Sequence, residues 1–127
     1  MSFGDIVKIF ERYKNFKGWH IRFFGYEFED FGVLNVKIEM SGAADEVSGE
    51  VLNLGVKVCG VVEVRSDFVG GKSRSIFNGV RFSTSGIGGY CLEFDGFFED
   101  VPITLDVIRR RSDCYIVGKS VEIFQVR

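Results

Sequence analysis

The chain has 127 residues, of which 46% are hydrophobic and 27% are charged. This length fits one domain, and the composition is that of a globular protein rather than of a disordered chain. The 16 basic and 18 acidic residues give a formal net charge of −2 at pH 7, so the overall electrostatic field does not favour nucleic-acid phosphates. We therefore expect a single domain over residues 1–127 that does not bind nucleic acid directly.

The sequence shows neither a membrane-spanning segment nor a secretory leader. The longest uncharged stretch, from Phe82 to Leu92, is broken by polar residues and glycines, whereas about 20 apolar residues are needed to span a bilayer. The first residues lack a basic region followed by an apolar one. Cys59, Cys91 and Cys114 lie far apart and form no C-x-x-C pair. These features predict a reduced, cytoplasmic protein with no metal site and no cofactor.

The N-terminal segment from Phe3 to Phe16 has the spacing of an amphipathic helix. Its apolar residues recur three and four positions apart, and charged residues occupy the other faces. Ser2 followed by Asp5 resembles a capping box, and Gly18 stands where a helix is expected to end. The sequence therefore predicts a helix whose two ends are both marked.

After this helix the apolar residues alternate, as they do in half-buried strands. The aromatic segment from His20 to Glu29 predicts a strand with a bulge or kink near Gly25, and Leu34 to Met40 predicts a second strand. The link Asp30-Phe31-Gly32 is short enough to join them as a hairpin. Residues Ser41 to Glu50 have no periodicity and are expected to form an exposed loop.

The second half of the chain is predicted to consist of strands and turns. The expected strands are Leu52 to Val64, bent at Gly55 or Gly60, then Ile76 to Ser83, Tyr90 to Asp95, Ile103 to Val107, and Cys114 to Val126, bent at Gly118. Arg109 to Asp113 is expected to be a charged turn. One helix followed by about seven strands with short links predicts an α+β fold, in which the N-terminal amphipathic helix packs on a mostly antiparallel β-sheet.

Few residues suggest catalysis. His20 is the sole histidine, so any Ser-His-Asp or Cys-His arrangement would have to include it, and its place at a helix-to-strand junction favours a structural hydrogen bond. Carboxylates such as Glu27 and Glu29, or Glu93 and Asp95, could act as an acid and a base on a sugar. The polar outer face of a sheet is the simpler explanation for them. We expect no enzyme, and a small hydrolase is the least favoured alternative.

Aromatic side chains are numerous, and several stand beside acids. The chain has 14 phenylalanines, more than a core of this size ordinarily uses. Phe97-Phe98 precede Glu99-Asp100, and Phe28 and Phe31 flank Glu29-Asp30. Large apolar anchors next to acids are typical of a surface that binds a basic protein. Filling of the core between sheet and helix is the alternative explanation.

Two segments carry a family resemblance. The N-terminal helix contains Asp5-Ile6-Val7-Lys8-Ile9-Phe10, and a late strand contains Gly79-Val80-Arg81-Phe82. With the size, acidity and element order of the chain, they make it resemble the small immunity proteins that protect bacteria from polymorphic and contact-dependent growth-inhibition toxins. The resemblance implies a cytoplasmic, non-catalytic protein that binds a cognate toxin domain, expected to be a basic nuclease, and blocks its active site or substrate path.

The binding surface expected from this resemblance is acidic and partly aromatic. Acidic side chains can mimic the phosphate charge that a nuclease recognises, and they accelerate association with a basic domain. The candidate partner-binding residues are Asp30, Asp45, Glu46, Glu50, Asp95, Phe97, Phe98, Glu99 and Asp100.

A small-ligand or lipid carrier is the alternative function. A curved sheet under the helix would then enclose an apolar pocket lined by Phe23, Phe24, Tyr26, Phe82 and Phe94. Homodimerisation through an exposed sheet edge is compatible with each of these functions.

Overall fold

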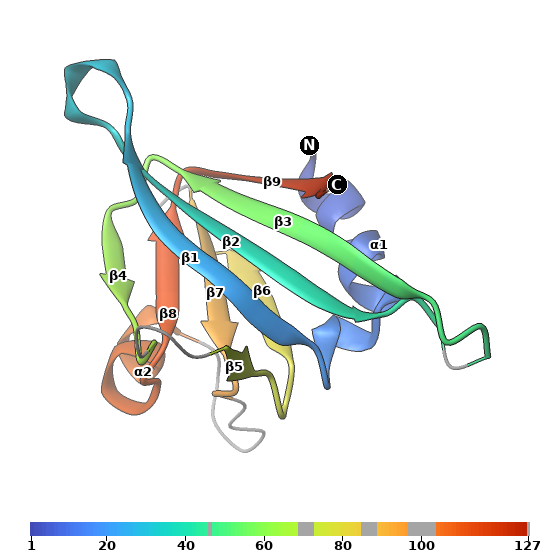
Figure 1. The fold of residues 1–127 in the computed structure, drawn as a ribbon. Coiled ribbons are helices and arrows are strands. Elements are labelled where there is room, and N and C mark those ends of the chain that lie inside the picture. The colour runs from blue at the N-terminus through green and yellow to red at the C-terminus, as the bar shows by residue number, and fades with distance from the viewer. Residues whose placement is uncertain (46, 69–72, 85–88, 97–103, 127) are drawn as a thin grey trace.

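The fold is that of a computed structural model, which describes residues 1–45, 47–68, 73–84, 89–96 and 104–126 (Figure 1). These residues form two α-helices and nine strands, and the strands are arranged in two sheets with antiparallel pairing throughout. The predicted α+β class with an N-terminal helix is confirmed. The expectation of one sheet of about seven strands is corrected to two smaller sheets that enclose the core between them.

The larger sheet has the strand order β5-β1-β2-β3-β9. Its strands are β1 (His20–Phe28), β2 (Leu34–Ala43), β3 (Val51–Cys59), β5 (Arg74–Ser75) and β9 (Ser120–Gln125). The predicted β1–β2 hairpin is confirmed, and a short 3-10 turn (Asp30–Gly32) closes it. The irregularity in β1 falls between Ile21 and Phe23 rather than near Gly25. The strand β2 extends three residues beyond the predicted end at Met40, into the segment expected to be a loop.

The smaller sheet has the order β4-β8-β7-β6. Its strands are β4 (Glu63–Arg65), β6 (Val80–Thr84), β7 (Tyr90–Phe94) and β8 (Tyr115–Gly118).

At one corner of the fold, the chain passes twice from one sheet to the other. Each of the two long strands that we predicted is divided there, because β3 continues as β4 and β8 continues as β9 in the other sheet. Gly60 has φ +64°, and a Cβ at Gly118 would lie 2.4 Å from a methyl group of Val58. The absence of side chains at both positions lets the two crossing segments approach closely. The bends at Gly60 and Gly118 were predicted, but the change of sheet was not.

The first helix, α1 (Phe3–Arg12), begins at the predicted capping box. The Ser2 hydroxyl accepts a hydrogen bond from the Asp5 N–H (3.2 Å), and the Ser2 N–H donates to the Asp5 carboxylate (3.3 Å). The helix ends at Arg12, earlier than predicted, and a left-handed turn over residues 14–16 follows it. This turn directs the Phe16 side chain into the core, where it is fully buried.

The second helix, α2 (Leu105–Arg111), corrects two predictions. The segment was expected to contain a strand up to Val107 and a charged turn from Arg109. Five alternating residues do not distinguish a strand from a short helix, whereas Thr104 caps the helix by accepting from the Val107 N–H (3.3 Å). Three arginines occupy the last turn, where positive charge is favourable, and Arg109 forms an ion pair with Glu63 of β4 (2.7 Å).

The main core lies between the two sheets and α1. Phe10 of α1 contacts Phe82 of β6, with the ring centroids 5.5 Å apart. The buried apolar residues include Ile6, Phe10, Phe16, Trp19, Ile21, Val36, Ile38, Met40, Val56, Val58, Ile76, Leu92, Phe94, Ile116 and Val121. The pattern of apolar residues on β2 was thus predicted correctly.

Candidate functional site

The predicted partner-binding residues do not form one surface in the described part of the chain. Asp30 lies at the tip of the β1–β2 hairpin, whereas Asp45 and Glu50 lie in the connection between β2 and β3, at the opposite end of these strands (Figure 1). Asp95 directly follows β7. The remaining five, Glu46, Phe97, Phe98, Glu99 and Asp100, lie outside the described residues.

Asp95 has its carboxylate engaged within the chain. One oxygen accepts a hydrogen bond from the Arg74 guanidinium (2.9 Å), and the other accepts from the Asn78 N–H (2.7 Å). The Asp95 N–H donates to the carbonyl of Gly79 (3.0 Å). These contacts connect β5, β6 and β7, so Asp95 has a structural role in this corner of the fold.

Aromatic side chains are exposed along β1 and at the tip of its hairpin. Tyr26 is 51% exposed, Phe28 is 75% exposed, and Phe31 is fully exposed. Phe31 has φ +67°, in the left-handed region, within the turn that closes the hairpin. We call this end of the hairpin the hairpin-end surface; Tyr26 and Phe28 lie on one face of β1, Phe23 and Glu27 on the other, and Asp30, Phe31 and Val33 at the tip.

The outer edge of β1 is open along this surface. β5 pairs only with His20 and Ile21, and no other described strand pairs on that side of β1. An edge strand presents unpaired backbone N–H and C=O groups that can hydrogen-bond to another chain. The aromatic residues from Phe23 onward therefore lie beside backbone groups that are available for pairing.

The acids of the hairpin differ in what they contact. Glu29 accepts a hydrogen bond from the side-chain amide of Asn35 (2.6 Å), which is fully buried and in turn accepts from the Gly60 N–H (3.1 Å). Glu29 is therefore part of the structure of the sheet. Glu27 lies 3.9 Å from the Lys57 ammonium and is exposed, and Asp30 is exposed at the tip. Glu27 and Asp30 are the acids best placed to face a partner.

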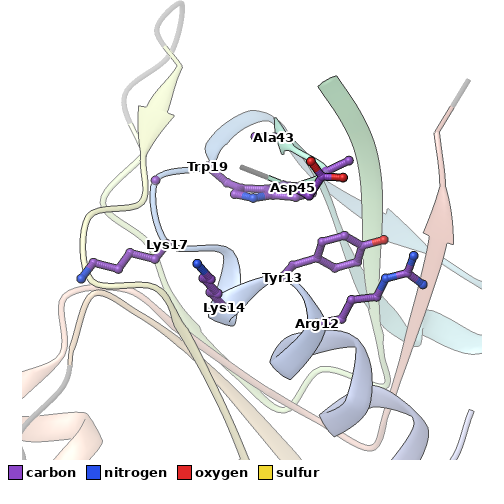
Figure 2. A pocket seen from close by; sticks show the side chains of 9 residues that line it. Arg12, Tyr13, Lys14, Lys17, Trp19, Ala43 and Asp45 are labelled. Atoms are coloured by element: carbon purple, nitrogen blue, oxygen red, sulfur yellow. The ribbon is translucent and has the colours of Figure 1, made fainter. Parts of the chain in front are cut away.

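A second candidate site is a cleft at the other end of the hairpin (Figure 2). It has a volume of about 380 Å³. It lies between the end of α1 and the β2–β3 connection, and we call it the Trp19 cleft. Its lining residues are Arg12, Tyr13, Lys14, Lys17, Gly18, Trp19, Ala43, Ala44 and Asp45. Among its described lining residues, Arg12, Lys14 and Lys17 are basic and Asp45 is acidic.

Trp19 forms a rigid wall of this cleft. It is 3% exposed, and its ring contacts Phe16 and Tyr13 at centroid distances of 5.0 and 5.5 Å. A Cβ on Gly42 would lie 2.3 Å from the indole ring, so the ring rests directly on the backbone of β2. Figure 2 shows the indole nitrogen on the ring edge turned toward Lys14.

Asp45 lies at the rim of the Trp19 cleft, beside the Trp19 ring in Figure 2. Its carboxylate accepts hydrogen bonds from the N–H groups of Val47 (2.8 Å) and Ser48 (2.6 Å). These hydrogen bonds, that of Ser48 first, lower the pKa of Asp45 below its usual value. The cleft thus has one fixed negative charge at its rim.

The two carboxylate pairs weighed for catalysis differ: Glu27 and Glu29 both lie near the Lys57 ammonium (3.9 and 3.8 Å), whereas Glu93 and Asp95 bind different arginines. Glu93 is buried in an ion pair with Arg81, whereas Asp95 binds Arg74, so these two carboxylates have separate surroundings. The His20 Nδ1 lies 3.1 Å from the Ser75 hydroxyl, a contact that joins β1 to β5.

The cysteines are free thiols, and two of them are buried. Burial raises the pKa of Cys91 and of Cys114 to about 12, which keeps both thiols protonated at neutral pH. Within the described ranges, no three residues of the types that ligate metals lie close enough together to hold an ion.

The apolar pocket expected for a carrier is not formed by its five predicted residues. Phe94 is buried in the main core, whereas Phe23 and Tyr26 are exposed on opposite faces of β1. Phe24 packs against Phe68 at a centroid distance of 4.3 Å. Phe82 lines a different cavity of about 360 Å³ beside α1. Successive side chains of β1 point to opposite faces of the larger sheet, and Phe82 and Phe94 belong to the smaller sheet. The five side chains therefore do not line one pocket.

The Trp19 cleft was not predicted from the sequence. The signal for it is the segment from Arg12 to Trp19, in which three basic residues alternate with Tyr13, Phe16 and Trp19. Residues this close in sequence line the same cleft only if the chain changes direction between them, and the turn after α1 makes that change of direction.

Comparisons with family models, with curated proteins and with solved structures found no match to this chain. Neither helix in the described part of the chain is long and apolar enough to cross a lipid bilayer. The function must therefore be argued from the hairpin-end surface and the Trp19 cleft themselves.

Proposed function

We propose that this chain is a non-catalytic binding protein that docks a basic protein domain on the hairpin-end surface. The observation that carries the proposal is the exposure of Tyr26, Phe28 and Phe31 together on an unpaired edge strand. Buried aromatic anchors account for most of the binding energy at protein interfaces. An isolated exposed aromatic residue is ordinary, but a contiguous group of them is typical of an interaction surface.

The charge of the surface supports a basic partner. Asp30 at the tip is exposed, and so is Glu27 on the face of β1 opposite Tyr26 and Phe28. Acids at the rim of an apolar patch attract a basic domain and accelerate its approach, while the apolar centre supplies most of the affinity.

The resemblance to immunity proteins suggests what the partner is. In our proposal the basic domain is a cognate bacterial toxin, a nuclease by expectation, and the docked hairpin blocks its active site or substrate path. The encounter takes place in the cytoplasm, which is compatible with three reduced cysteines. A projecting hairpin is suited to this task because it can enter a concave active site that a flat sheet face cannot reach.

The experiment is a capture of partners from a lysate of the source organism with matched surface variants. Phe28→Ser with Phe31→Ser alters the hairpin-end surface, and Phe77→Ser removes an equally exposed phenylalanine (73%) from elsewhere. We expect a stoichiometric basic protein with the wild type and with Phe77→Ser, and its loss with the double variant.

The captured protein is then expressed alone and together with the chain in a bacterial host. Growth arrest that the wild-type chain relieves, and the double variant does not, would support the proposal. A partner that binds the double variant as strongly as the wild type would refute the assigned surface. A captured protein that does not impair growth would refute the toxin as the partner.

A further inference from the structure

We propose that two copies of this chain associate by pairing their β1 strands edge to edge. Residues 24–28 of one copy run antiparallel to residues 24–28 of the other, and the larger sheets of the two copies form one continuous sheet. The occupant of the open β1 edge is therefore a second copy of the chain, and the pairing uses the part of this edge that no described strand covers. The inference concerns the chain alone and does not rest on the docking of a basic partner.

The first argument is the direction of the backbone groups of β1. The Glu29 N–H donates to the carbonyl of Val33 across the hairpin (2.8 Å). Hydrogen-bonded and non-hydrogen-bonded pairs alternate in an antiparallel ladder, so the odd-numbered residues of β1 that follow its irregularity bond to β2. The N–H and C=O groups of Phe24, Tyr26 and Phe28 therefore point to the open edge, where a second strand can pair with them.

The second argument is that this edge lacks the usual protection of edge strands. Exposed edges in monomers are usually covered, or they carry Lys, Pro or a bulge. At the opposite edge of the same sheet, the Ile123 N–H of β9 donates to the Met1 sulfur (3.3 Å). From Phe24 to Phe28 the β1 edge has neither Lys nor Pro, and the irregularity of β1 lies outside this stretch. Tyr26 and Phe28 are also largely exposed, so this edge is suited to pairing with another strand.

The third argument is that the stretch is complementary to itself. In a two-fold symmetric dimer, each residue contacts a partner residue that contacts it in return in the other half of the interface. Pairing centred on Tyr26 places Tyr26 opposite its own copy and Phe24 opposite Phe28, and all three have outward backbone groups. Aromatic pairs across neighbouring strands stabilise a sheet. On the other face of the sheet, Glu27 lies opposite Gly25, so no two like charges are directly opposed.

The same register provides charge complementarity at both ends of the interface. It brings the hairpin tip of one copy, with Asp30, beside Arg22 of the other copy, and the two-fold axis repeats this pair. Both side chains are exposed in the single chain. The pairing also covers Tyr26 and Phe28 of the hairpin-end surface, so self-association and docking of a partner through these side chains exclude each other.

The first test measures the mass of the wild-type chain by analytical ultracentrifugation over a range of concentrations. We expect a reversible equilibrium between monomer and dimer. Hydrogen exchange followed by NMR should slow with rising concentration at the amides of Phe24, Tyr26 and Phe28. The amides of Gly25 and Glu27 already bond to β2 and should change little. A chain that remains monomeric up to about 1 mM would overturn the proposal.

The second test uses the position of Tyr26 on the two-fold axis. Tyr26→Lys and Tyr26→Glu each place two like charges opposite each other, so each variant alone should dimerise at least about tenfold more weakly than the wild type. Mixed in equal amounts, the two variants should form a heterodimer, which also shows that both are folded. Phe77→Lys changes an exposed aromatic side chain outside β1 and should leave the dimer unchanged.

Two outcomes of the second test contradict pairing centred on Tyr26. One is that both charged variants dimerise as tightly as the wild type. The other is that their mixture associates no better than either variant alone. These measurements contain no partner protein, so their result is independent of partner capture by the hairpin-end surface.

Discussion

The two ends of the β1–β2 hairpin differ in charge and in how their aromatic side chains are held. At the tip, aromatic residues are exposed among acids; at the base, Trp19 is buried beside basic residues (Figures 1 and 2). Nine residues of β1 separate the ends by about 30 Å. The same pair of strands therefore has an exposed aromatic and acidic tip and a base whose aromatic side chain is held in the core.

The difference is clearest at two glycines of the hairpin. Gly25 lies under the ring of Phe23, which is 46% exposed, and Gly42 lies under the buried ring of Trp19. An exposed ring can rotate into solvent when its neighbour changes, whereas a buried ring cannot. The Phe23 ring is therefore able to move, whereas the Trp19 ring is held in place.

The largest expected effect is on partner binding at the tip. Replacing Phe28 and Phe31 by Ser should lower the affinity for the captured basic protein at least about a hundredfold, since each removes an aromatic anchor. The melting temperature should stay close to that of the wild type, because both side chains already face solvent. Surface plasmon resonance and thermal unfolding measure the two quantities. A loss of affinity that is matched by unfolding would contradict the assignment.

The next effect is on the stability of the base. Gly42→Ala places a Cβ against the Trp19 ring and should destabilise the fold by about 1–3 kcal/mol. Gly25→Ala makes a similar contact with Phe23, but the exposed ring can move aside, so the cost should be well below that of Gly42→Ala. Urea unfolding followed by circular dichroism compares the two. Equal destabilisation by the two variants would show that the Phe23 and Trp19 rings are held equally firmly.

A smaller effect is expected on the rate of association. Glu27→Lys with Asp30→Lys should slow association with a basic partner about tenfold at low ionic strength, and the difference should shrink in about 0.5 M salt. Asp113→Lys makes the same kind of change at an exposed position outside the hairpin. Stopped-flow association rates at several salt concentrations provide the test. A ratio of wild-type to variant rates that does not change with salt would exclude steering by these acids.

The smallest effect is the pH response of the loop at the base. Hydrogen bonds from Ser48 and Val47 lower the pKa of Asp45 from its ordinary value of 3.8. A lowered pKa means that the stabilisation is present above 3.8 and is lost as the pH falls through the lowered value. The amide resonances of Val47 and Ser48 should therefore shift with a midpoint below 3.8, and Asp45→Asn should remove this titration. A midpoint at or above 3.8 would contradict the hydrogen bonds.

The parts of the fold that could be predicted are those with long local patterns. The helix α1 has an apolar stripe over three turns and a capping box, and β1 and β2 have clear alternation with a short link. The helix α2 has seven residues, too few for its period to show, and its position depends on contacts such as that of Arg109 with Glu63. Gly60 and Gly118 indicated bends, but a bend does not specify which strand the next segment will pair with.

The candidate sites were harder to predict than the fold. Tyr26 and Phe28 have the alternation of core residues, because they pair with Val36 and Leu34 on the face of β2 that points inward. They are exposed because the hairpin extends past the smaller sheet (Figure 1), and the sequence carries no information on where a neighbouring sheet ends. The Trp19 cleft depends on the turn after α1 meeting residues near Asp45, which are distant in sequence.

The corner at Gly60 and Gly118 couples the stability of the two sheets. Because β3 runs into β4, and β8 runs into β9, two separate chain segments connect the sheets at this corner. The strand β9 also pairs with β3, so residues 120–125 complete a sheet whose other strands come from residues 20–75. Unfolding should therefore be a single cooperative event.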